Sequence, residues 1–337
     1  MKTVWITGAG GLIGNYLVRS APPYAPGATA VQDCLDPLVG PRAVPARSAQ
    51  EDGRRLENQG VRERGWPLRA GTARGPGEPD AALTVIALSR AMLDLTDASA
   101  VRAAFRRQAP QLVIHCAALS RSPACEANPA LARQLNVDVT ALLAELAADI
   151  PLLFLSSDLV FDGRKGNYDE TAPGNPLGVY AETKAAAEQI ILANPRHTVV
   201  RTSLNGGISP TRDRGFNEQM RLAWQAGQRM KLFTDEFRSP IPAEVTARAI
   251  WELAAPSRPG LYHVAGSERL SRWEIGQLLA ARWPQLKPRI EPGSLREYSG
   301  APRAPDTSLN CAKAQTLLSF PLPGLTKWLA AQPDEAF

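Results

Sequence analysis

Histidine and cysteine are scarce in this sequence. Its 337 residues include 3 histidines and 4 cysteines. The cysteines, Cys34, Cys116, Cys125 and Cys311, form no CxxC pair and no four-ligand zinc spacing, and a chain of this length does not need disulfides for stability. We therefore expect reduced cysteines, a cytoplasmic location and no metal site.

Long apolar stretches and hydrolase motifs are also missing. No run of about 18 apolar residues is present to span a bilayer, so we expect no membrane insertion. The sequence has no G-x-S-x-G turn, and His115, His197 and His263 all lie within apolar runs, where a packed histidine is the default. A serine hydrolase is therefore disfavoured.

The excess of positive charge is small and dispersed. Lys and Arg number 38 against 33 Asp and Glu, for a net charge of +5. The basic residues are mixed with acidic ones and form no stripe studded with aromatic side chains, so we expect no nucleic acid partner. A weakly positive surface also suits a phosphorylated small molecule.

Short apolar runs alternate with Ala- and Leu-rich segments along most of the chain. The runs are 3–7, 84–88, 111–115, 151–156, 197–201 and 260–264, and the helical segments are 98–108, 129–148 and 181–193. Segments of this length can cross between neighbouring parallel strands. The pattern predicts an α/β fold of the Rossmann type, a doubly wound parallel sheet with right-handed crossovers.

The alternation loosens after residue 204. We expect an NAD(P)-binding Rossmann domain over 1–204, and a smaller C-terminal substrate lobe over 205–337 from which one or more segments return to the sheet. Residues from about 30 to 82 are rich in Pro, Gly and Arg and have no periodic apolar face. They predict a disordered insertion. The alternative is that Ala30–Asp33 begin the second strand.

A glycine-rich turn follows the first apolar run. Gly8, Gly11 and Gly14 recur every three residues between a strand and the helical pattern that starts at Leu12. Glycine allows a tight turn and the close approach of a pyrophosphate to backbone N–H groups, and Gly14 can bring helix and sheet together. The spacing departs from the commoner G-x-G-x-x-G, and a purely structural turn would look the same.

The end of the second strand bears on the choice of cofactor. Ser89 and Arg90 follow the run 84–88. A basic residue there accommodates a 2′-phosphate, whereas an acid binds the ribose hydroxyls, so NADP(H) is favoured while NAD(H) stays open. Asp94 and Leu95 follow where a third strand should end, and the Asp94 carboxylate could accept a hydrogen bond from the adenine amino group.

A tyrosine and a lysine stand one helical turn apart in the segment YAETK. Tyr180 and Lys184 are neighbours on one face if this segment is helical. An ammonium about 5 Å from the phenol would lower its pKa by roughly two units, which favours proton exchange with a carbonyl oxygen. Ser157, at the end of the run 151–156, is placed to hydrogen-bond that oxygen.

Together these motifs resemble the extended short-chain dehydrogenase/reductase family. The matching segments are TGAGGLIG, Ala117-Ala118, Asn136, SSDLVFDG, YAETK and RTS, and TDEFRSPIPAE and GLYHVAG resemble the dTDP-4-dehydrorhamnose reductase branch and the related regulatory subunit of methionine adenosyltransferase. The resemblance implies Ser157, Tyr180 and Lys184 as the catalytic triad. It implies cofactor contacts at Gly8, Gly11, Leu12, Ile13, Gly14, Asp94, Leu95, Ala117 and Ala118.

The resemblance implies an NAD(P)-dependent oxidoreductase that reduces a carbonyl compound, with a nucleotide-linked 4-keto sugar as the expected substrate. Leu159 and Leu204 replace aromatic residues that the branch usually has near its sugar. A 4,6-dehydratase would carry a glutamate where Leu159 stands, which disfavours elimination. A sugar-nucleotide epimerase and a non-catalytic, NADP-binding regulatory subunit remain alternatives, and the sequence leaves a homodimer open.

Overall fold

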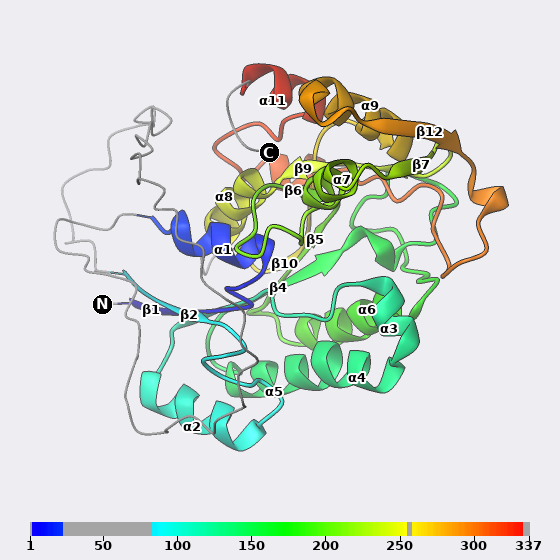
Figure 1. Cartoon of the computed structure of the whole chain (residues 1–337). Helices are drawn as coiled ribbons and strands as arrows, with labels where there is room; N and C mark the ends of the chain where they lie inside the picture. Colours follow the sequence, from blue (N-terminus) through cyan, green and yellow to red (C-terminus); the bar gives the residue numbers. More distant parts are fainter. Residues whose placement is uncertain (1, 23–82, 255–257, 333–337) are drawn as a thin grey trace, which may run out of the picture. The chain divides into compact units, whose positions relative to one another are not determined.

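The computed structural model in Figure 1 describes residues 2–22, 83–254 and 258–332. The predicted insertion over about 30–82 lies outside these residues, and so does the alternative strand at Ala30–Asp33. Within the described ranges no helix has both the length and the apolar character needed to cross a membrane.

Six parallel strands form the central sheet, as the apolar runs predict. They are β1 (Lys2–Thr7), β2 (Leu83–Leu88), β3 (Leu112–His115), β4 (Leu152–Ser157), β5 (Thr198–Thr202) and β10 (Gly260–Val264), in the order β10-β5-β4-β3-β1-β2. A parallel sheet covered on both faces favours continuous apolar strands, because both faces are buried. The Rossmann-type α/β fold is confirmed.

The third strand expected to end at Asp94-Leu95 is absent from the described residues. Only five residues separate the end of β2 at Leu88 from Asp94, whereas a parallel crossover needs a dozen or more. Asp94 instead closes a turn, accepting hydrogen bonds from the Thr96 N–H (3.0 Å) and the Thr96 hydroxyl (2.8 Å). The strand order therefore reverses between β1 and β3, with β2 at the sheet's edge.

Helices cover both faces of the sheet (Figure 1). One face carries α1 (Leu12–Arg19) and α8 (Ala243–Leu253), and the other carries α2 (Ala98–Gln108), α5 (Val139–Leu146) and α6 (Val179–Leu192). Val4 and Ile6 of β1 belong to the first core and Trp5 to the second, because successive side chains of a strand point to opposite faces. The predicted helical segment 129–148 is divided into α4 (Pro129–Arg133), a π-helical turn (Gln134–Asp138) and α5.

Much of the C-terminal part packs around its own apolar cluster, which includes Trp224, Ile275 and Leu325, whereas Ile241 and Ala314 belong to the core on the α1 face of the central sheet. The elements of the C-terminal part are β6 (Asn205–Gly206), α7 (Phe216–Gln225), β7 (Arg229–Phe233), β8 (Phe237–Arg238), β9 (Ile241–Pro242), β11 (Leu270–Ser271), α9 (Arg272–Arg282), β12 (Arg289–Gly293), α10 (Ala312–Gln315) and α11 (Leu325–Ala331). One further helix, α3 (Ser122–Ala127), follows β3. β10 lies in the central sheet although it follows residue 205, while the division into domains at residue 204 stays a prediction.

Candidate active site

A cleft of about 1490 Å³ opens at the carboxyl ends of β1, β3 and β4. Parallel α/β sheets bind ligands at this edge, where the strand order reverses. Every residue that the sequence predicted for the site lines this one cleft. They are Gly8, Gly11, Leu12, Ile13, Gly14, Ser89, Arg90, Asp94, Leu95, Ala117, Ala118, Ser157, Tyr180 and Lys184.

The glycine turn is shaped by close backbone approaches. Gly8 has φ +72°, and a Cβ there would lie 2.6 Å from the Ala117 nitrogen. A Cβ on Gly14 would lie 2.2 Å from the Gly8 carbonyl oxygen, which fits the predicted close packing of helix and strand. Any larger side chain at either position would displace backbone, so both glycines are required by the fold itself.

Gly10 differs from its neighbours, and the sequence assigned it no role. It lines the cleft, and a Cβ there would meet no atom of the described residues within 4 Å. The next helix, α1, begins after Gly11 without a side-chain cap from the described residues. Its first N–H groups are therefore free to bind an anion, whose charge the helix dipole also favours. The turn fits the pyrophosphate of a dinucleotide.

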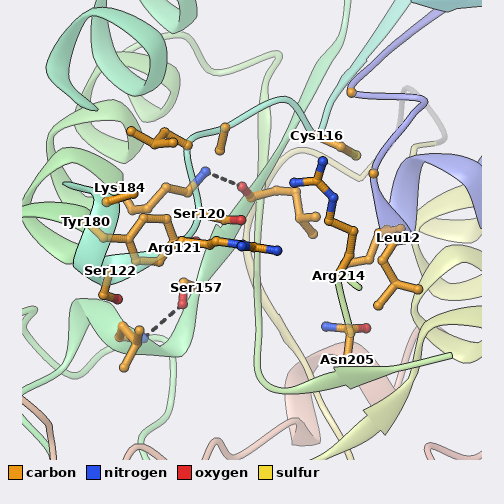
Figure 2. Close-up of a pocket in the computed structure, with 18 of the residues that line it drawn as sticks. Leu12, Cys116, Ser120, Arg121, Ser122, Ser157, Tyr180, Lys184, Asn205 and Arg214 are labelled. Atoms are coloured by element: carbon orange, nitrogen blue, oxygen red, sulfur yellow. Dashed lines mark hydrogen bonds between the residues drawn. The ribbon is translucent and has the colours of Figure 1, made fainter. Parts of the chain in front are cut away.

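Ser157, Tyr180 and Lys184 meet on the opposite wall (Figure 2). Ser157 ends β4, and the other two lie in the first two turns of α6. The Lys184 ammonium donates to the Leu155 carbonyl at 2.6 Å and lies 3.8 Å from the centre of the Phe154 ring. The Leu159 N–H donates to the Ser157 hydroxyl at 3.2 Å, and that hydroxyl donates to Asp158 Oδ1 at 3.1 Å.

Burial controls the protonation of this group. It raises the pKa of Tyr180 to about 12, although a hydrogen bond with Ser157 acts in the other direction. Burial also lowers the pKa of Lys184 to about 7, against the opposing effect of Glu188. The expected lowering of the tyrosine pKa is therefore wrong for the chain alone, because desolvation of the phenolate dominates. At neutral pH Tyr180 carries its proton, the state needed by a proton donor.

Asn136 has a positioning role that its sequence motif did not reveal. Its side-chain oxygen accepts from the Leu119 N–H at 2.7 Å. Its amide nitrogen donates to the Leu119 carbonyl (3.1 Å) and to the Thr183 hydroxyl (3.0 Å). Asn136 is 1% exposed, so these bonds are shielded from water and join the loop after β3 to the helix that carries Tyr180 and Lys184.

Sequence reasoning missed the charged residues on the C-terminal side of the cleft. Glu236 accepts from Arg272 Nε at 2.9 Å and from Arg303 Nε at 2.7 Å. Burial alone would raise the pKa of this carboxyl, but these arginines bring it to about 2. A second buried carboxylate, Asp158, pairs with Arg238 of β8. These residues lie far apart in the sequence, so no spacing could have indicated the cluster.

The family described as the RmlD substrate binding domain matches residues 78–335. The chain belongs to the RmlD substrate-binding domain family. The resemblance inferred from the sequence motifs is thereby confirmed, and the prediction of an NAD(P)-dependent oxidoreductase agrees with it.

Proteins with two different names are similar to this RmlD-family chain. Methionine adenosyltransferase 2 subunit beta of Xenopus tropicalis is 29% identical over 240 residues, which cover 67% of this chain and 70% of that protein. The dTDP-4-dehydrorhamnose reductase of Sinorhizobium fredii is 27% identical over 254 residues, covering 71% and 85%. The solved structure of dTDP-4-dehydrorhamnose reductase from Bacillus anthracis, in complex with NADP, has a TM-score of 0.74 at 20% identity and covers 98% of both chains.

Proposed function

We propose that this protein is an NADPH-dependent reductase of a carbonyl compound, and that its substrate is a nucleotide-linked 4-keto sugar. The observation that carries the proposal is the meeting of Ser157, Tyr180 and Lys184 in the cleft that also holds the glycine turn. A protein that only bound a dinucleotide would not need a protonated phenol facing that cleft. The dTDP-4-dehydrorhamnose reductases similar to this chain support the same reaction.

The residues of the cleft divide the chemistry between them. When bound, the reduced nicotinamide would supply a hydride to the carbonyl carbon. Tyr180 donates its phenolic proton to the carbonyl oxygen, which becomes the hydroxyl of the product. Ser157, oriented by the Leu159 N–H, would turn its hydroxyl proton from Asp158 to the same oxygen and stabilise the charge that develops there. Lys184, held by the Leu155 carbonyl, binds the ribose of the nicotinamide half.

The other predicted residues bind the rest of the cofactor. Gly8, Gly11 and Gly14 shape the turn for the pyrophosphate, and Leu12 and Ile13 present the first N–H groups of α1. Ala117 and Ala118 line the centre of the cleft, Ser89 and Arg90 take the 2′-phosphate, and Asp94 and Leu95 border the adenine. NADP(H) is the favoured cofactor and NAD(H) the alternative, in line with the NADP bound to the Bacillus anthracis reductase.

Arg90 is exposed at the rim of the cleft, directly after β2. We expect NADPH to bind more tightly than NADH by about 1–3 kcal/mol, the range of a charge-assisted hydrogen bond, and Arg90→Ala to remove most of that preference. Titration of both cofactors measures it. Arg106→Ala, an exposed change on α2 outside the cleft, is the control. Equal affinities in the wild type would exclude Arg90 from the site.

The C-terminal wall offers a site for the diphosphate of the substrate. Glu236 engages only Nε of Arg272, so both Nη groups of Arg272 have no hydrogen-bond partner among the described residues. Arg303 hydrogen-bonds both Glu236 and Tyr298. Both arginines line the cleft, where planar guanidinium groups suit phosphate oxygens. A nucleotide-linked sugar would place its diphosphate here and its keto group at Tyr180.

Arg303→Gln is expected to raise the KM for a nucleotide-linked 4-keto sugar about tenfold with little change in kcat. The contact is remote from the reacting carbon, and so it stabilises ground state and transition state alike. Steady-state kinetics at saturating NADPH measures both constants. Arg289→Gln, an exposed change on β12 outside the cleft, is the control. An unchanged KM would separate Arg303 from the substrate.

The proposed activity is tested by mixing the protein with NADPH and a panel of nucleotide-linked 4-keto sugars, with free keto sugars as comparison. Absorbance of the reduced nicotinamide should fall with the nucleotide-linked compounds. Oxidation with free sugars alone would contradict the assigned substrate class. No oxidation with any carbonyl compound would contradict the reductase.

The second candidate is a non-catalytic, NADP-binding regulatory subunit. It is supported by the similarity to methionine adenosyltransferase 2 subunit beta, a name shared by relatives from several vertebrates. Tight NADPH binding without turnover on the panel would favour it over the reductase. A sugar-nucleotide epimerase would convert its substrate without net NADPH oxidation, which product analysis detects. A homodimer and a cytoplasmic location stay predictions.

A further inference from the structure

Two arginines from opposite walls of the cleft share one carboxylate. Arg121 immediately precedes α3, and Asp213 and Arg214 lie in the segment between β6 and α7. The Arg121 Nη2 group donates to Asp213 Oδ2 at 2.8 Å. Arg214 Nε lies 3.3 Å from Asp213 Oδ1 and 3.3 Å from the Thr211 hydroxyl. All three charged residues line the cleft, and neither the proposed catalytic triad nor the glycine turn uses them.

This cluster keeps unused hydrogen-bond donors. Both Nη groups of Arg214, together with Nε and Nη1 of Arg121, have no partner among the residues that the structure describes. Two guanidinium groups against one carboxylate leave a net positive charge. The side chains are 55% exposed for Arg121 and 48% for Arg214, so an incoming ligand can reach both. The cluster therefore has the charge and the free donors to bind an anion.

Figure 2 shows where the two guanidinium groups point. Both reach into the space between Leu12, at the start of α1, and Tyr180, at the start of α6. A dinucleotide whose pyrophosphate lies at the glycine turn and whose nicotinamide lies beside Tyr180 must cross this space. The arginines of the C-terminal wall, Arg272 and Arg303, engage Glu236 instead, and among the described residues no hydrogen bond or ion pair joins them to this cluster.

We propose that Arg121 and Arg214 form a second half of the cofactor site, in which they bind the pyrophosphate from the side opposite the glycine turn. Asp213 holds both guanidinium groups in position. The backbone N–H groups at the start of α1 and the two arginines would then enclose the same anion from two sides. This inference rests on the proposed binding of NADPH, and it adds ligands that come from outside the glycine motif.

Two ligands distinguish binding of the pyrophosphate from binding of the adenosine and its 2′-phosphate. NADPH contains the pyrophosphate, whereas adenosine 2′-monophosphate keeps the adenosine and the 2′-phosphate but has no phosphate at the 5′ position. The double variant Arg121→Gln/Arg214→Gln should raise the Kd of NADPH about tenfold, or more, since two charge-assisted contacts are lost. Its Kd for adenosine 2′-monophosphate should change less than about twofold. Its NADPH affinity should also depend less on salt, because two positive charges are gone.

Arg212→Gln is the matched control, since Arg212 lies in the same segment, is exposed and does not line the cleft. An unchanged NADPH affinity in the double variant, with normal binding by the wild type, would overturn the inference and leave the proposed reductase intact. An unchanged NADPH affinity with a raised KM for the nucleotide sugar would also overturn it, by assigning the arginines to the substrate. A wild type that binds neither ligand would overturn both the inference and the proposed function.

Discussion

Replacing Tyr180 by phenylalanine is expected to lower the single-turnover rate of NADPH oxidation by about 10²–10⁴-fold, the range for a lost general acid. The substitution removes the transferable proton and little volume, so NADPH should bind as it does to the wild type. The raised pKa of Tyr180, about 12, supports the donor role, because the phenol is protonated at neutral pH. Rapid mixing with the best keto substrate measures the rate, and a cofactor titration measures binding.

Two further variants in the same experiment distinguish the roles of the triad. Ser157→Ala should slow turnover less than Tyr180→Phe, because one hydrogen bond to the oxygen is lost while the proton donor remains. Lys184→Ala should weaken NADPH binding and also slow turnover. The reason is that Lys184 binds the nicotinamide ribose in the proposed mechanism and lies beside the proton donor, Tyr180. Reduction at the wild-type rate by Tyr180→Phe would show that the proposed mechanism is wrong, however well the cofactor binds.

Replacing Arg238 by methionine is expected to lower the free energy of unfolding by about 3–5 kcal/mol, the cost of leaving a buried charge without its partner. Asp158 is 0% exposed and Arg238 is 6% exposed, so the pair has little contact with water in the folded protein. The Ser203 hydroxyl, 2.6 Å from Asp158 Oδ2, remains as a donor and favours the lower end of this range. Urea denaturation followed by circular dichroism measures the change.

The double variant Asp158→Asn/Arg238→Met is the comparison for this prediction. It removes both charges, so it should recover a substantial part of the stability lost in Arg238→Met alone. Together with the two single variants, Asp158→Asn and Arg238→Met, it forms a double-mutant cycle that measures the interaction energy of the pair. A double variant as unstable as the sum of the two single variants would mean that the pair has no coupling. Arg238→Met with wild-type stability would mean that Asp158 is neutral or solvated in the folded protein.

The sheet could be predicted because its signals are local. Each strand buried on both faces needs a continuous apolar run, and each crossover needs a helical segment of sufficient length. Gly8 and Gly14 could be found by their spacing, and the structure shows why a Cβ is excluded at both. Tyr180 and Lys184 could be paired because residues four apart on a helix are neighbours.

The third strand at Asp94-Leu95 was wrong for a reason of chain length. The few residues after β2 cannot cross back to the sheet. The tyrosine pKa was wrong for a different reason. Sequence reasoning treated the Lys184 charge as the main influence on Tyr180, whereas burial of the phenol has the larger effect in the folded chain.

The six strands of the central sheet, the glycine turn and the Tyr180–Lys184 spacing could be read from the sequence alone, because each depends on residues that are close together in the chain. The pairing of charged residues on the C-terminal side of the cleft depends on the tertiary structure. Hydrogen bonds join Arg238 to Asp158, Arg303 to Glu236, and Arg121 to Asp213. The partners of each pair lie 67–92 residues apart in the sequence. Pairing of this kind depends on how the C-terminal elements pack beside β3 and β4, and burial then sets the protonation of each group.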